Sequence, residues 1–299
     1  MQVEELFLSV KEETSAEVYL QEPLKNHTSI KIGGPADILA IPKSIEDLRK
    51  IHLLANSLNL PLFILGAGSN LLIADEGFRG MVVKTSGLCA FEIRGEAVLA
   101  QAGVYLPSLL KELEKANLSG LEFSAGVPAS LGGAVVMNLG AFGAEIGRLI
   151  SGVKVMNKKG ELKTLFQPDL KFGYRRSSLT ESELIVLEVI LKLSKEDPGR
   201  VEGKIKKYLA ERKASQPLDK LSCGSIFKNP EGNFAGKLIE ETGLKGFKIG
   251  DAQVSEKHAN FIINLGNASS RDVLALIEKI QETVEQKFRI KLEPEIKIV

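Results

Sequence analysis

The chain has 299 residues, of which 44% are hydrophobic and 26% charged, as expected for a soluble globular protein of about two domains. Its formal net charge of +1 argues against nucleic-acid or membrane-surface partners held by bulk electrostatics. The only cysteines, Cys89 and Cys223, cannot build a disulfide framework or a zinc site, and they fit a reducing cytosol. The N-terminal segment carries acidic side chains and no continuous apolar stretch, so we expect no signal peptide.

The first predicted elements form a β-α-β unit. Residues 4–20 have the spacing of a short amphipathic helix, and residues 26–42 are typical of two strands around a glycine turn. Ser44 is a good N-cap for a helix over residues 45–58, where apolar residues recur at helical spacing. Residues 62–65 then predict a short buried strand.

A glycine-containing loop with the sequence GAGSN follows this strand at residues 66–70. Its Gly-x-Gly pair resembles a dinucleotide-binding fingerprint, but Leu71 stands where a third glycine belongs, and residues 71–83 look like strands instead of a helix. We therefore reject a Rossmann site. Successive backbone N–H groups of the loop can still form an anion nest for a phosphate, and a structural hairpin turn is an equally good interpretation.

The stretch from Leu121 to Gly147 is rich in glycine, and it carries no charge from Phe123 to Ala144. It is long enough to span a membrane. Its polar residues, Pro128 and five glycines leave too little apolar surface for that role. Because glycine lets the backbone approach a ligand closely, we interpret the stretch as a bed for a bound molecule, with a buried core turn as the alternative.

The later part of the chain alternates strands and helices without an internal repeat or a coiled coil. Strands are predicted over residues 97–104, 152–156, 161–166, 184–193 and 260–265, and over the final LEPEIKIV. Helices are predicted over residues 106–118 and 201–214, from about residue 235, and after the N-cap Ser269. Residues 196–199 predict a linker, so the last third is expected to form a separate domain.

Three polar positions outside the glycine-rich stretch can carry chemistry. Arg175 offers a planar, permanently charged fork for a carboxylate or phosphate, and the alternative is a solvated arginine on a hairpin. Ser225 can hand over a proton if its neighbours polarise it, although it can equally be a turn residue. Glu295 lies just before the apolar end of the last strand, where a solvated edge is the alternative. The three histidines lack metal-ligand spacing, and we expect surface or capping roles for them.

Taken together, the motifs resemble the UDP-N-acetylenolpyruvoylglucosamine reductase family. The resemblance covers about Asn26 to Val299, and its segments follow one another in the family's order. No single segment is decisive, but all eight in order are highly specific. They are HTSIKIGGPAD, LGAGSNLLI, SAGVPASLGGAVVMNLGAFG, FGYRRSS, CGSIFKNP, AGKLIEETGLKG, VSEKHANFIIN and LEPEI.

The resemblance implies an α+β protein. Its fold would be an FAD-binding fold of the vanillyl-alcohol-oxidase type made of two subdomains, plus a C-terminal α+β substrate domain. The expected divisions are residues 1–84 for the N-terminal segment and first FAD-binding subdomain, 85–195 for the second, and 200–299 for the substrate-binding domain.

The resemblance also implies which positions bind FAD and substrate. The pyrophosphate of FAD would be held by Gly66, Ala67, Gly68, Ser69 and Asn70. The dinucleotide and flavin would be lined by Ser124, Gly126, Pro128, Ser130, Gly133, Ala134 and Asn138. Substrate binding is expected at Tyr174, Lys228, Asn229 and Lys237, and no metal is expected.

The reaction implied is the NADPH-driven, flavin-dependent reduction of UDP-N-acetylglucosamine enolpyruvyl ether to UDP-N-acetylmuramate, a step of peptidoglycan precursor synthesis in the cytoplasm. NADPH would first reduce FAD. Reduced FAD would then pass hydride to C3 of the substrate, and Ser225 would protonate C2. Arg175 and Glu295 match the family's pair that polarises the substrate carboxylate, where a fixed cation stabilises developing charge. We expect a monomer with no nucleic-acid or membrane partner.

Two features depart from the family pattern. Ala129 stands where glycine is common, and the tyrosine-bearing insertion of one subgroup is missing, so the chain resembles the shorter subgroup. Two other functions remain open at this point: a different FAD-linked oxidase or dehydrogenase on the same fold, and a non-catalytic nucleotide-binding module. The CGSIFKNP and LEPEI segments argue against the different oxidase, because in the family they belong to the substrate side.

Overall fold

The computed structural model describes residues 2–299. The chain forms two compact units, each assembled from several stretches of sequence. Unit 1 consists of Met1–Gln21, Asp37–Ala67 and Arg79–Ala210, and unit 2 of Glu22–Ala36, Gly68–Phe78 and Glu211–Val299.

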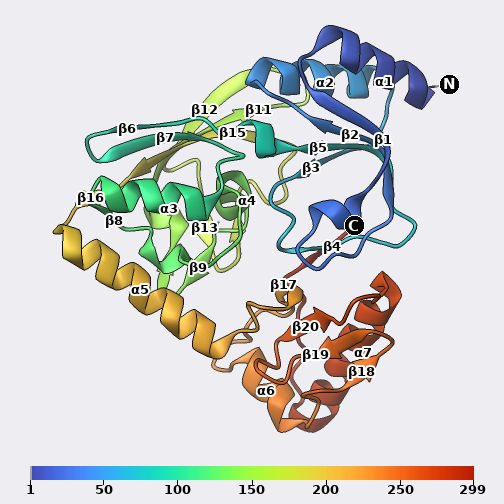
Figure 1. Cartoon of the computed structure of the whole chain (residues 1–299), viewed down its shortest axis with the longest axis vertical. Helices are drawn as coiled ribbons and strands as arrows, with labels where there is room; N and C mark the ends of the chain where they lie inside the picture. The colour runs from blue at the N-terminus through green and yellow to red at the C-terminus, as the bar shows by residue number, and fades with distance from the viewer. Residues whose placement is uncertain (1) are drawn as a thin grey trace. The chain divides into compact units, whose positions relative to one another are not determined.

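The first layer of unit 1 is a four-stranded sheet covered by two helices. Its strands lie in the order β1 (Glu17–Pro23), β2 (Pro35–Ile41), β5 (Phe78–Lys84) and β3 (Leu62–Leu65), with β3 and β5 parallel. Helices α1 (Gln2–Glu13) and α2 (Ile45–Ser57) lie side by side along this sheet (Figure 1). Their apolar faces meet it through buried residues such as Leu6, Ile51 and Val83, as amphipathic spacing requires.

The N-cap of α2 is tied to the chain ahead of it by one buried carboxylate. Ser44 and Asp47 form the predicted capping box, in which each side chain bonds the backbone N–H of the other. The Asp47 carboxylate also accepts from Lys43 N and from both N and Oγ of Ser15, the latter at 2.7 Å. It therefore holds the link after α1 against the start of α2.

We expect Asp47→Asn to lower the free energy of unfolding by about 1–3 kcal/mol at pH 7, because a buried charge-assisted network is lost. Burial raises the pKa of Asp47, but hydrogen bonds from Ser15, Lys43 and Ser44 outweigh it and hold the pKa below the ordinary value of 3.8. A depressed folded-state pKa means that this stabilisation is present above pH 3.8 and is lost as the pH falls through the lower folded value. Urea unfolding at pH 7 and pH 3 measures both effects.

The exposed Glu46→Gln is the control for this prediction, since Glu46 lies in the same helical turn and pairs only at the surface with Arg49. It should change the unfolding free energy by less than about 0.5 kcal/mol. Equal stability of Asp47→Asn and wild type at pH 7 would contradict the role given to the carboxylate.

The second layer of unit 1 is a five-stranded antiparallel sheet. Its order is β12 (Leu162–Phe166), β11 (Ile150–Met156), β15 (Ile185–Lys192), β7 (Ala97–Gln101) and β6 (Phe91–Arg94). The amphipathic α3 (Leu106–Lys115) and the short α4 (Leu131–Val136) share one hydrophobic core with this sheet. The glycine-rich stretch contributes Leu131 and Val135 to that core, so its apolar side chains are structural.

Small elements complete unit 1. Three two-stranded ribbons pair β8 (Leu118–Ser119) with β16 (Ser194–Lys195), β9 (Gly140–Ala141) with β10 (Ala144–Glu145), and β13 (Phe172–Gly173) with β14 (Arg176–Ser177). Short 3-10 turns cover Thr85–Gly87, Glu122–Ser124 and Ile146–Arg148. The long α5 (Pro198–Ser215) begins in this unit.

Unit 2 is a four-stranded antiparallel sheet packed with helices. The order is β17 (Leu221–Ser225), β20 (Phe261–Asn264), β19 (Ala252–Val254) and β18 (Lys248–Ile249). Helices α6 (Ala235–Glu241) and α7 (Ser270–Phe288) supply its core, and Ser269 caps α7 through a capping box, as predicted. The C-terminal β21 (Lys297–Ile298) runs parallel to β4 (Leu71–Leu72).

Three predicted elements are wrong. The first helix ends at Glu13, where Thr14 Oγ1 bonds Val10 O, and the strand-favouring Val18 and Tyr19 lie in β1. Residues 26–32 form no strand. A 3-10 turn over Leu24–His27 and a left-handed Lys31 (φ 59°) close a loop there.

The linker predicted at residues 196–199 is also shorter than expected. Pro198 starts α5, since proline is favoured in the first helical turn, where its missing N–H costs no hydrogen bond. Within residues 2–299, no helix is long and apolar enough to cross a membrane.

Candidate active site

In unit 1 the start of the GAGSN loop adjoins the N-terminus of α4. Ser130 is the N-cap of α4, and its Oγ accepts from Gly133 N at 3.4 Å. A Cβ on Gly66 would lie only 2.3 Å from that Oγ. The two segments predicted to bind the cofactor are thus in contact here, and glycine at position 66 is what permits it.

The remaining predicted cofactor residues of unit 1 line the turns around α4. Ser124 is buried and donates to Leu121 O, while Gly126 has φ 78°, a left-handed conformation that favours glycine. Ala129 is buried with no glycine-specific backbone angle, so alanine fits at this departure from the family pattern. Pro128, Gly133 and Ala134 belong to the same turn and helix.

Gly66→Ala is expected to raise the Kd for FAD at least about tenfold and to lower the unfolding free energy by about 1 kcal/mol. The new Cβ must push Ser130 Oγ off the Gly133 N–H, which removes the helix cap beside the loop. FAD titration followed by flavin absorbance measures the first effect. Gly199→Ala, in open space at the start of α5, is the control. An unchanged Kd would show that the contact is irrelevant to the cofactor.

The second half of the loop belongs to unit 2. Gly68 takes φ 68° and lies against the His27 carbonyl, where a Cβ would approach to 2.1 Å. Asn70 Nδ2 donates to Glu295 O at 3.2 Å, and Asn70 O accepts from Lys297 N. Within residues 2–299, nothing accepts a hydrogen bond from the backbone N–H groups of residues 66–70.

Asn138 connects the glycine-rich stretch to the Arg175 hairpin. It is fully buried, its Nδ2 donates to Glu145 Oε2 at 3.1 Å and to Gly173 O at 2.9 Å, and its Oδ1 accepts from Gly147 N. Its amide is thus engaged by protein groups. Sequence reasoning had no signal for these bonds, because the partner Gly173 is 35 residues away.

Arg175 sits at the tip of a tight hairpin in unit 1. Tyr174 and Arg175 are the two loop residues between β13 and β14, and Arg175 has a left-handed φ of 54°. The Arg175 guanidinium lies 5.1 Å from the Tyr174 ring centroid, a cation–π arrangement. The hydroxyls of Ser177 and Thr180 both donate to Val136 O at the end of α4, which fastens the hairpin to that helix.

In unit 2, Ser225 ends an irregular strand. Its pairing with β20 contains a bulge between Ser222 and Ser225, and Gly224 within it has φ 80°. The neighbouring Cys223 is fully buried, and burial raises the pKa of its thiol to about 12. The thiol is therefore inert near neutral pH.

Glu295 lies on the chain segment next to Ser225. Phe227 and Pro294 form an antiparallel bridge, and Glu295 N donates to Ile226 O at 2.7 Å. The structure therefore brings two of the three predicted catalytic residues onto adjacent backbones. The C-terminal segment is less regular than predicted, since only Lys297–Ile298 is strand and the Ile298 side chain is 48% exposed.

The predicted substrate-binding residues are spread over both units. Tyr174 is exposed at the hairpin tip of unit 1. In unit 2, Lys228 pairs with Glu293, Asn229 Oδ1 accepts from Ala235 N at the start of α6, and the exposed Lys237 pairs with Glu241. Their binding role stays a prediction.

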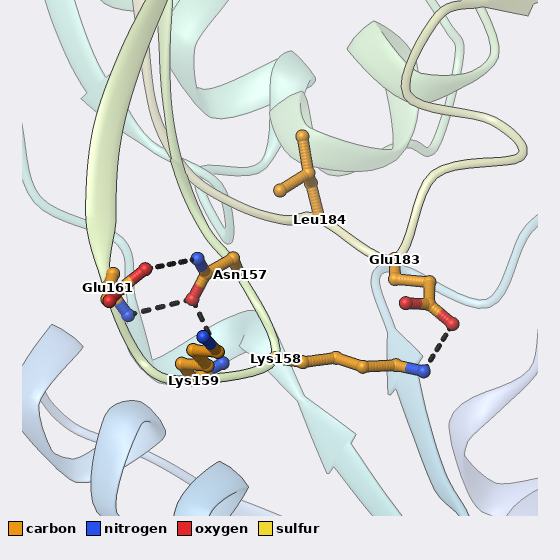
Figure 2. A pocket seen from close by; sticks show the side chains of 6 residues that line it. All are labelled: Asn157, Lys158, Lys159, Glu161, Glu183 and Leu184. Atoms are coloured by element: carbon orange, nitrogen blue, oxygen red, sulfur yellow. Dashed lines mark hydrogen bonds and ion pairs between the residues drawn. The ribbon is translucent and has the colours of Figure 1, made fainter.

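The histidines and a surface hollow of unit 1 add no predicted site residue. His52 is buried, contrary to the surface or capping role expected for the histidines. Within residues 2–299, no cluster of three potential metal ligands occurs. A hollow of about 390 Å³ beside the β11–β12 turn is lined by side chains that pair with one another, including Lys158 with Glu183 and Asn157 with Glu161 (Figure 2).

Comparison with known proteins first defines the class. Residues 36–165 match the FAD binding domain family, and residues 216–299 match the C-terminal domain of UDP-N-acetylenolpyruvoylglucosamine reductase. The chain is thus an oxidoreductase with an FAD-binding domain and a distinct C-terminal domain, which confirms the predicted α+β fold class.

The particular family follows from whole-chain relatives. The UDP-N-acetylenolpyruvoylglucosamine reductase of Clostridium tetani is 46% identical over 285 residues, covering 95% of this chain and 93% of its own. That of Caldanaerobacter subterraneus is 46% identical over 282 residues, covering 94% and 93%. The crystal structure of the Thermus caldophilus reductase matches with a TM-score of 0.81 and 37% identity over 95% of this chain and 98% of its own. The chain belongs to the UDP-N-acetylenolpyruvoylglucosamine reductase family.

Proposed function

We propose that this protein reduces the enolpyruvyl ether of UDP-N-acetylglucosamine to UDP-N-acetylmuramate, with NADPH as the reductant and FAD as the cofactor. The observation that carries the proposal is the backbone pairing that sets Ser225 beside Glu295, two positions that match the family's catalytic residues. Family membership over nearly the whole chain supports the substrate.

FAD fits the residues predicted to hold it. The N–H groups of residues 66–70 have no protein acceptor within the described chain, and the left-handed Gly68 is typical of an anion nest. We propose that this loop binds the pyrophosphate. The rest of the cofactor would be lined by Ser124, Gly126, Pro128, Ser130, Gly133, Ala134 and Asn138. Bound FAD would supply hydride transfer, which no protein side chain can perform.

The protein's own residues would position substrate and move a proton. We propose that Arg175 holds the substrate carboxylate, because a guanidinium fork fits a carboxylate and stabilises charge that develops on it. Ser225 would donate the proton to C2. Glu295 would act at the same carboxylate, with Tyr174, Lys228, Asn229 and Lys237 binding the UDP-sugar.

We propose the further division of the chain into residues 1–84, 85–195 and 200–299. Three hydrophobic clusters correspond roughly to these three parts. The cluster around α1 and α2 also draws on β11 and β15, and the cluster of unit 2 also includes Ile30, Ile32 and Leu72 from the first part. The free cysteines fit a reducing cytoplasm, where we place the enzyme as a monomer.

Absorbance spectra of the purified protein test this function. The oxidised flavin bands should bleach on anaerobic addition of NADPH and return when the enolpyruvyl substrate is added, with UDP-N-acetylmuramate as the product. Protein that stays colourless after FAD is supplied would overturn the proposal. Bleaching without recovery by this substrate would leave a flavoprotein that acts on something else.

A further inference from the structure

We propose that Asn260 is a positioning residue that holds Ser225 where it can deliver its proton. This inference rests on the proposed role of Ser225, and it concerns unit 2 alone. Asn260 lies in the VSEKHANFIIN segment, immediately before β20, and carries no role in the function described above.

The strand that carries Ser225 needs an external support. The bulge between Ser222 and Ser225 breaks the regular ladder between β17 and β20, and Ser225 is the last residue of β17. Ser225 is paired with Phe261 of β20, and the two residues after it lie beyond the end of the strand. The position of Ser225 therefore depends on its pairing with Phe261 and on whatever fixes the next two residues.

Asn260 supplies that support with both its backbone and its side chain. Its carbonyl accepts from Ile226 N at 2.9 Å. Its Oδ1 accepts from Phe227 N at 2.9 Å, and its Nδ2 donates to Phe227 O at 2.8 Å. The amide thus takes the place of a paired strand residue, satisfying both backbone groups of Phe227. An asparagine is suited to this because one amide provides a donor and an acceptor.

The bonds of Asn260 to Ile226 and Phe227, here called the clamp, are held in place by burial and by a contact with His258. Asn260 is 4% exposed and Phe227 1%. Without the Asn260 amide, the backbone N–H and C=O of Phe227 could not bond water instead, and leaving them unpaired costs free energy. His258 Nδ1 accepts from Asn260 N at 3.2 Å, which also holds the Asn260 backbone in place. Burial, with the charge of Lys245 added, lowers the pKa of His258 and keeps its ring neutral and able to accept.

The backbone of Ile226 lies between Asn260 and Glu295. Ile226 N donates to Asn260 O, and Ile226 O accepts from Glu295 N. Loss of the Asn260 amide would free residues 226–227 to shift against the C-terminal segment. A displacement of about 1 Å at a reacting group costs on the order of 100-fold in rate.

Asn260→Ala and the control Asn264→Ala test the inference in the FAD-loaded enzyme. Asn264 is an equally buried asparagine on β20, and its amide bonds Ile30 O, Gly266 N and Ala268 N, away from the Ser225 segment. Stopped-flow absorbance measures flavin reduction by NADPH and, separately, reoxidation by the enolpyruvyl substrate at saturation. We expect Asn260→Ala to slow reoxidation by about 10- to 100-fold and leave reduction within about twofold, with both steps near normal in Asn264→Ala.

Asn260→Asp gives a second readout that a general loss of folding would not mimic. The new carboxylate keeps the acceptor for Phe227 N but opposes the Phe227 carbonyl, and a proton on it restores the donor. Reoxidation in this variant should therefore recover as the pH falls toward 5, while wild type shows no such rise. Adding Ser225→Ala to Asn260→Ala should slow reoxidation less than the two separate effects combined, because both act on one proton transfer.

The outcomes separate this inference from the proposed function. Equal reoxidation rates in Asn260→Ala and Asn264→Ala, or no acid recovery in Asn260→Asp, would overturn the positioning role. If Ser225→Ala alone leaves reoxidation unchanged, the proposed proton donor fails, and the positioning role fails with it.

Discussion

Ser225→Ala is expected to slow flavin reoxidation by the enolpyruvyl substrate by about 10²- to 10⁴-fold, the usual contribution of a positioned general acid. Reduction of the flavin by NADPH should stay within about twofold of wild type, because no proton from Ser225 is needed in that half. Stopped-flow absorbance in the oxidised flavin band follows both halves of the reaction separately.

Ser222→Ala is the matched control, since it removes the same hydroxyl from the same strand, β17, before the bulge. It should leave both halves unchanged. If Ser225→Ala loses flavin reduction but retains reoxidation, Ser225 acts in the first half of the reaction and is not the proton donor of the second. Unchanged rates in both halves would remove Ser225 from the chemistry.

Arg175→Lys is expected to slow the same second half by about 10²- to 10³-fold, the cost of removing a preorganised charge contact in a transition state. An ammonium group keeps the charge but cannot reproduce the two-pronged geometry of a guanidinium. The substitution changes the side chain at a left-handed position without adding β-branching, so the hairpin backbone should be retained.

Arg176→Lys is the comparison for this variant. Arg176 is the exposed neighbour in β14, so the same guanidinium-to-ammonium change is made one residue away, outside the two-residue loop. Circular dichroism and flavin content should be normal in both variants. Wild-type reoxidation in Arg175→Lys would exclude a guanidinium contact with the substrate carboxylate.

Local sequence rules predicted most regular elements. The capping boxes at Ser44 and Ser269 and the helices after them follow from contacts three or four residues apart, which a sequence displays directly. The alternating strands 150–156 and 162–166 were predicted to within two residues because a tight turn joins them. The failures at residues 14–20 and 26–32 occurred where the Thr14 side chain bonds Val10 O, where Val18 and Tyr19 enter a strand, and where Lys31 is left-handed.

The candidate site residues were predicted from motif order, and the structure added contacts between residues distant in the sequence. The resemblance of ordered motifs pointed to Arg175, Ser225 and Glu295, while residue chemistry alone left each with an ordinary structural alternative. The structure accounts for Asn138 differently from the sequence, because its buried amide bonds Gly173 O and supports the Arg175 hairpin. Its proposed contact with the flavin stays untested.

The sequence by itself determined the family, the α+β class and the glycine-rich loops, since these depend on composition, short-range periodicity and motif order. Tertiary structure alone decided which backbones lie together. Asn70 reaches Glu295 across 225 residues, and Asn260 reaches Phe227 across 33. Hydrogen bonds between such distant groups form because burial leaves each polar backbone atom in need of a partner, and only the folded chain determines which partner is near.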